Sequence, residues 1–142
     1  MTGGSTFPVT LSQIEAEFEG LEDWDERYEY LVELGREIPS LAADLKIPEH
    51  VVKGCMSTVW LVPRQHADGT FEFLADSDSL IVKGLLVVVL AAFSGKTSAE
   101  ILDYDVHQVF ERLGLSQHLS ANRRNGLFAM VGRIRRAAAG EA

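Results

Sequence analysis

A run of nine consecutive apolar residues, 85–93, is the feature that most restricts how this chain can fold. A helix that crosses a membrane needs about 20 such residues, so this run is too short to span a bilayer. It must therefore be buried in protein, and we expect it to form the main part of a core helix over 80–93. Asp78 is placed to cap the N-terminus of this helix, and Gly95 is placed to end it.

Capping signals and apolar periodicity predict amphipathic helices on both sides of this core helix. Thr10 to Gln13 has the form of a capping box, and so has Thr97 to Glu100. Asp23 and Ser120 can cap two longer helices, each with an apolar stripe at helical spacing. The expected helices cover residues 10–19, 23–37, 40–45, 97–102, 105–113 and 121–139.

Two strand-like segments, 58–65 and 70–75, are joined by Asp68-Gly69, a pair typical of hairpin turns. Pro48 is expected to begin an extended approach to this hairpin, with 51–53 as a candidate third strand. The order of helices, then a small antiparallel sheet, then helices indicates the α+β class. We expect one domain over 11–139, preceded by a flexible leader at 1–10.

The charge of the chain is uneven as well as negative. The net charge is −8, which disfavours binding to nucleic acid or to an anionic membrane. Residues 1–50 carry twelve acidic and three basic side chains, whereas residues 112–142 carry six arginines and one acid. Two interpretations stay open at this point, namely solvated helix faces of opposite sign or a surface that docks another protein.

Cys55 is the only cysteine, so it cannot form a disulfide within the chain, and a reducing cytoplasmic setting is favoured. It follows Gly54, which permits a turn, and a nearby cation, Lys53, favours the reactive thiolate. From these residues alone, a packed thiol and a reactive thiol are equally good interpretations. His50 and His66 form no tight ligand pair with Cys55, so no metal is expected, and because no glycine-rich phosphate-binding pattern is present, no bound cofactor is expected either.

Arg123 falls in the first turn of the expected last helix, where the helix dipole disfavours a cation. We therefore expect this arginine to have a partner, either an aspartate or an incoming anionic group. Asp76 and Asp78 are interpreted first as turn and cap residues between the hairpin and the core helix.

Three segments together resemble the SufE family of sulfur-acceptor proteins, which includes the CsdE branch. The first carries the Gly-Cys-x-Ser-x-Val-Trp pattern, the second Asp-Ser-Asp followed by Ile-Val-Lys-Gly, and the third His-Leu followed by Arg-x-x-Gly-Leu. In this chain they are residues 53–60, 76–84 and 113–127, and the resemblance extends over about 11–138.

The resemblance implies a SufE/IscU-like α+β fold, with a small antiparallel sheet packed against helices at both chain ends. It implies that Cys55 accepts persulfide sulfur from a PLP-dependent cysteine desulfurase of the SufS or CsdA type and stimulates that enzyme. The sulfur would then pass to a downstream iron–sulfur assembly scaffold, and the acceptor would be an accessory protein, monomeric or homodimeric. Asp78 and Arg123 match family residues near the cysteine loop, while Met56 and Thr58 stand where most members have Gln.

Two further hypotheses concern the surroundings of the thiol. Cys55 is expected to rest partly sheltered and to move outward when the partner docks, and Arg123 is expected to pair with Asp78. An iron–sulfur scaffold is the alternative function, but a cluster needs about four thiolate-type ligands and the chain offers one cysteine. A standalone thiol enzyme is the third alternative, with no base that the sequence places beside Cys55.

Overall fold

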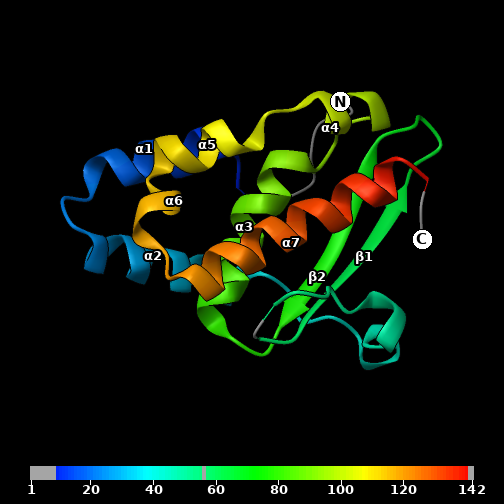
Figure 1. Cartoon of the computed structure of the whole chain (residues 1–142), viewed down its shortest axis with the longest axis horizontal. Coiled ribbons are helices and arrows are strands. Elements are labelled where there is room, and N and C mark those ends of the chain that lie inside the picture. Colours follow the sequence, from blue (N-terminus) through cyan, green and yellow to red (C-terminus); the bar gives the residue numbers. More distant parts are fainter. Residues whose placement is uncertain (1–8, 56, 141–142) are drawn as a thin grey trace.

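The computed structural model describes residues 9–55 and 57–140 and has the expected α+β architecture (Figure 1). Along the chain, helices come both before and after a two-stranded antiparallel sheet. The α-helices are α1 (Leu11–Gly20), α2 (Trp24–Glu37), α3 (Leu80–Phe93), α4 (Ser98–Asp103), α5 (Val106–Leu113), α6 (Leu115–His118) and α7 (Ala121–Ala138). The strands are β1 (Val59–Gln65) and β2 (Phe71–Ser77), and the 3₁₀ helices are η1 (Ala43–Leu45) and η2 (Pro48–His50).

The apolar run lies in α3, which is the central helix of the core, as expected. It packs against α1, α2, α7 and β2. The contact with α2 depends on two glycines. A Cβ at Gly84 would collide with the carbonyl of Leu31, and a Cβ at Gly35 would come within 2.6 Å of the Leu80 carbonyl oxygen. In the described part of the chain, no helix combines the length and the apolar character that a membrane span requires.

The hairpin has the predicted turn, and its register runs from Val59 opposite Ser77 to Gln65 opposite Phe71. The Asp68 carboxylate accepts hydrogen bonds from the backbone N–H and the hydroxyl of Thr70. The expected third strand is wrong, since only one isolated bridge joins Val51 to β1 at Trp60.

The extended approach from Pro48 is also wrong, because residues 48–50 form η2. The proline occupies the first position of this 3₁₀ helix, where its restricted φ is favourable and its missing N–H costs nothing. Together with the turn at Gly54, η2 leaves only Val51 and Val52 beside β1. The leader, expected at 1–10, falls mostly on residues 1–8, which lie outside the described residues.

Helix starts follow the capping predictions at α1, α2, α4 and α7, including both capping boxes. The predicted cap of α3 is wrong. β2 continues to Ser77, two residues beyond its expected end, so Ser79 becomes the residue whose hydroxyl accepts from the N–H of Val82. The carboxylate of Asp78 bonds instead to the backbone of Thr58.

Two smaller helices also differ from the sequence predictions. The helix expected over 40–45 is only the single 3₁₀ turn of η1, because the N–H of Leu41 donates to a distant carboxylate and its side chain is buried. The α6 turn was not predicted, since its four residues are too short to show a periodic pattern.

That distant carboxylate belongs to Asp76, which is only 3% exposed and lies within β2, not in the expected turn. Its oxygens accept from the backbone N–H groups of Leu41 and Ser77, at 3.0 and 2.8 Å. They also form ion pairs with Lys46 at 3.3 Å and with Lys83 at 3.2 Å. Burial raises the pKa of Asp76, but these four partners outweigh it and hold the pKa below the ordinary carboxyl value. Asp76 therefore joins β2 to the 41–46 segment and to α3.

Replacing Asp76 by Asn should lower the free energy of unfolding at pH 7 by about 2–3 kcal/mol, because both lysines lose their charged partner. The ionised carboxylate stabilises the fold above the unfolded-state pKa of about 4, and this contribution disappears as the pH falls through the depressed folded-state pKa. Urea denaturation should thus show that the variant's loss of unfolding free energy, relative to the wild type, is smaller in acid than at pH 7. Asp44→Asn, at an exposed carboxylate of η1, is the matched control. An equal deficit at both pH values would contradict this account of Asp76.

Candidate functional site

The loop that carries Cys55, residues 53–58, is held at both of its ends. At its entrance, the N–H of Val52 donates to the carbonyl of Val59 at 2.8 Å. At its exit, the N–H of Thr58 donates to Oδ1 of Asp78 at 3.2 Å, and the carbonyl of Thr58 accepts from the hydroxyl of Ser77 at 2.8 Å. The cysteine loop is therefore tied to β1 and to the residues that close β2.

Helix α7 forms the floor under the cysteine loop. The Cys55 Sγ lies 3.7 Å from the carbonyl oxygen of Gly126, and a Cβ added to Gly126 would be 3.5 Å from this sulfur. Gly54 has φ +93°, a conformation that side chains with a Cβ rarely adopt, and a Cβ there would lie 3.4 Å from Cβ of Ala129. Small residues on α7 thus let the loop approach the helix closely, with the thiol half-buried against it.

A cavity of about 340 Å³ opens beside the thiol, where α3 and α7 begin at the same end of the molecule (Figure 1). Ser79 and Ser120, the N-cap residues of these two helices, both line it. Helix N-termini carry partial positive charge, so this end of the cavity favours an anion. The described lining is Cys55, Ser57, Ser79, Val82, Leu85, Ser120, Asn122, Arg123, Gly126 and Met130.

Burial raises the pKa of the Cys55 thiol, so at neutral pH the resting sulfur is mainly protonated. Arg123 lines the cavity, but its side chain makes no hydrogen bond or ion pair with the residues that the structure describes. The expected pair between Arg123 and Asp78 is therefore wrong. Asp78 is instead bonded to the loop exit at Thr58, while the exposed Arg123 lines the cavity.

The structure brings together Gly54, Cys55 and Arg123, and it links Asp78 to them through the backbone of Thr58. Gly126, Ser79 and Asn122 also belong to the site, although none of them is predicted there from the sequence. The signal for Gly126 was the glycine in the Arg-x-x-Gly-Leu segment, in the middle of an otherwise regular helix. Met56, one of the two departures from the family pattern, lies outside the described residues.

The two histidines closest to Cys55 in the sequence have other partners. Nδ1 of His50 is 2.6 Å from the Leu45 carbonyl oxygen, and His66 faces Glu72 at 3.5 Å. Over residues 9–55 and 57–140, no group of three or more His, Cys, Asp or Glu side chains is arranged to hold a metal ion. The lining of the cavity beside Cys55 includes no histidine and no carboxylate, so within the described chain the thiol has no general base there.

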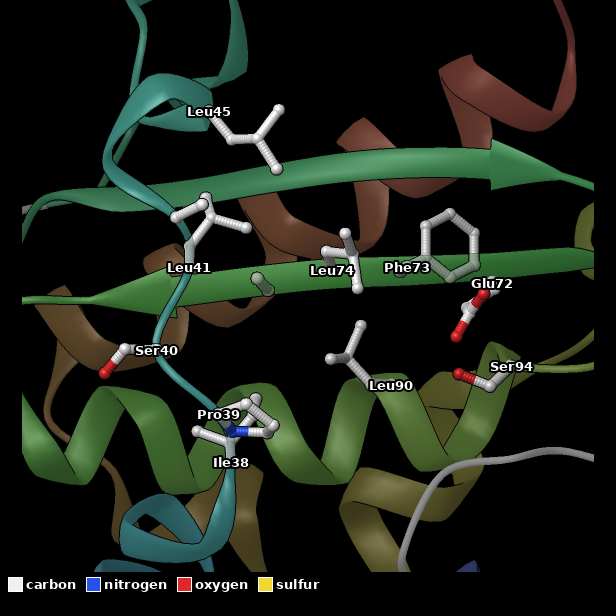
Figure 2. Close-up of a pocket in the computed structure, with 12 residues that line it drawn as sticks. Ile38, Pro39, Ser40, Leu41, Leu45, Glu72, Phe73, Leu74, Leu90 and Ser94 are labelled. Atoms are coloured by element: carbon white, nitrogen blue, oxygen red, sulfur yellow. The ribbon is translucent and has the colours of Figure 1, made fainter.

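A second cavity, of about 300 Å³, lies between β2, α3 and the segment that leads to η1 (Figure 2). Phe73 and Leu74 from β2, Leu90 from α3 and Leu41 from that segment surround it, and its lining is largely apolar. No cysteine or histidine belongs to the described lining of this cavity. The single thiol of the chain therefore lies beside the first cavity and not beside this one.

Comparison with known proteins agrees with this arrangement. The family model described as "SufE: Fe-S metabolism associated domain" matches residues 12–138. A SufE-like protein of Rhizobium etli is 44% identical over 136 residues, which are 94% of this chain and 92% of that protein. The chain therefore belongs to the SufE family, whose domain is associated with iron–sulfur metabolism.

A solved structure shows the same fold. The solution structure of a hypothetical protein from Thermus thermophilus superposes with a TM-score of 0.71, covering 92% of this chain and 93% of that one. The two sequences are only 17% identical, so this likeness concerns the fold alone.

The raised pKa of Cys55 leads to a direct test of its environment. Alkylation by iodoacetamide should have a higher pH midpoint in the folded protein than in the urea-unfolded chain, because the thiolate reacts and burial disfavours it. The single cysteine makes the unfolded chain its own matched control. By the same linkage, this thiol's contribution to stability is present below the unfolded-state pKa and is lost as the pH rises through the folded-state pKa. A folded midpoint at or below the unfolded one would contradict the sheltered position described above.

Proposed function

We propose that this protein accepts sulfane sulfur on Cys55 from a PLP-dependent cysteine desulfurase of the SufS or CsdA type. It stimulates that enzyme by removing the sulfur and passes the sulfur on to an iron–sulfur assembly scaffold in a reducing compartment such as the cytoplasm. The observation that carries the proposal is a single half-buried thiol on an anchored loop beside a polar cavity that contains Arg123.

The transfer is an exchange between two sulfur centres with no net oxidation or reduction. The Cys55 thiolate attacks the terminal sulfur of the donor persulfide, and a new S–S bond forms on Cys55. The S–S bond of the donor breaks, and the donor cysteine leaves as a thiolate that takes up the proton lost by Cys55. One sulfur atom moves, and neither metal nor bound cofactor takes part in this step on the acceptor.

The surroundings of the thiol support an acceptor that depends on its partner. A cysteine hydrolase needs a base beside the nucleophile, and no histidine or carboxylate lines the cavity among the described residues. Burial also favours the protonated thiol, which limits oxidation while the protein waits for a donor. Docking of the donor moves Cys55 outward from Gly126 and places it against the persulfide.

The proposal can be tested by following alanine release from the desulfurase of the same organism, supplied with PLP and free cysteine. The wild-type protein should increase the turnover rate, and Cys55→Ser should return it to the rate of the desulfurase alone, because no sulfur can be transferred. Gly20→Ala is the matched control, since a Cβ at this helix end meets nothing within 4 Å. Equal stimulation by Cys55→Ser and wild type would refute the proposed role of Cys55.

A further inference from the structure

The side of α7 that supports the cysteine loop continues along the helix as a line of arginines. Gly126, Ala129, Arg133 and Arg136 follow one another at spacings of three or four residues, which places them on one side of an α-helix, and Arg123 lies three residues before Gly126. Gly126 and Ala129 are the two positions that meet Cys55 and Gly54. Leu127, Met130 and Ile134 are buried in the core, and Arg123 continues their row toward the N-terminus of α7, where it lines the cavity beside the thiol.

Arg123, Arg133 and Arg136 differ from the other arginines nearby in their lack of partners. Arg124 donates to the carbonyls of Ser116 and Leu119, and Arg135 donates to the carbonyl of Tyr104. By contrast, the side chains of Arg123, Arg133 and Arg136 have no hydrogen bond or ion pair within the part of the chain that the structure describes. We call these three residues the arginine stripe.

Two of these guanidinium groups are close enough to disfavour each other. Arg133 is partly buried, and burial followed by the charge of Arg136 lowers its pKa. Like charges held together without a counter-charge destabilise the free protein, and a negative partner relieves this cost. The stripe therefore offers three uncompensated positive charges in a chain whose net charge is −8.

The stripe also has the right position for a partner that must reach the thiol. Arg133 follows Gly126 by seven residues, which is two helical turns and about 10 Å along the axis. An interface of ordinary size, about 800 Å² on each partner, covers both positions at once. Eight of the twelve acidic residues in 1–50, in comparison, lie on α1 and α2, and none of the twelve belongs to the described lining beside Cys55.

We propose that the arginine stripe is the docking face for an acidic surface of the sulfur donor, which lies along α7 and meets Cys55 over Gly126. This inference rests on the proposed function and adds to it the direction of approach and the charge of the partner surface. It decides between the two charged regions of the chain in favour of the arginine-rich end.

The test compares two double charge reversals in binding to the desulfurase of the same organism, measured by titration calorimetry. Arg133→Glu/Arg136→Glu should weaken binding by about tenfold or more, because attraction becomes like-charge repulsion at the interface. Arg36→Glu/Arg64→Glu changes the net charge equally at exposed arginines of α2 and β1, and should bind nearly as wild type. At subsaturating protein, sulfur transfer should slow in Arg133→Glu/Arg136→Glu and should stay near the wild-type rate in the control pair.

The dependence of affinity on salt concentration is a second measurement, and in the wild type it does not depend on whether a mutant folds. Affinity of the wild type should fall as ionic strength rises, and Arg133→Gln/Arg136→Gln should make this dependence weaker. Equal affinities for the two charge-reversed proteins, or wild-type affinity that salt does not change, would overturn the docking face while leaving sulfur transfer intact. A wild type that neither binds the desulfurase nor accepts sulfur would overturn the docking face and the proposed function together.

Discussion

The buried carboxylate of Asp76 is the interaction on which the rest of this structure depends. Two lysines and two backbone amides converge on it, from the distant 41–46 segment, from the adjacent Ser77 and from Lys83 of α3. Removal of this charge from water is costly, and the fold compensates with four partners held in place around it. By joining β2 to α3 and to the 41–46 segment, Asp76 sets where the next three residues of the chain lie.

Those three residues hold the exit of the cysteine loop and line the cavity beside it. Ser77 and Asp78 bind the backbone of Thr58 and so hold the exit of the cysteine loop, while Ser79 caps α3 and lines the cavity. The segment 76–79 thus connects the core to the thiol, each side chain having a separate task. On the opposite side of the loop, α7 contributes small residues at Gly126 and Ala129, so the sulfur rests against helix backbone. This arrangement leaves the thiol half-buried, and its burial raises the pKa of Cys55 and so favours the protonated form.

Much of this could be predicted from the sequence, because local signals determine local structure. The apolar run of α3, the hairpin turn at Asp68-Gly69 and the caps of α1, α2, α4 and α7 each depend on neighbouring residues. The role of Asp78 could not be predicted in this way. A cap residue and a residue that holds a distant loop have the same local pattern, and only the two extra residues of β2 decide between them.

The partners of charged residues could not be predicted from the sequence either. Arg123 was expected to pair with Asp78, but a sequence does not show that Asp78 is bonded to the loop exit at Thr58. The resemblance to the SufE family correctly indicated the fold, whereas the lining of the cavity by Ser79 and Asn122 depends on how α3 and α7 meet.

The central claim is that Cys55 carries the transferred sulfur, and intact mass spectrometry tests it most directly. The protein is incubated with the desulfurase, PLP and cysteine, then separated, weighed and digested to locate any added mass. We expect the peptide that contains Cys55 to gain one sulfur atom, which a reductant should remove, and we expect no gain in Cys55→Ser. Sulfur found elsewhere on the chain, or a wild type whose mass stays unchanged while the desulfurase is active, would contradict it.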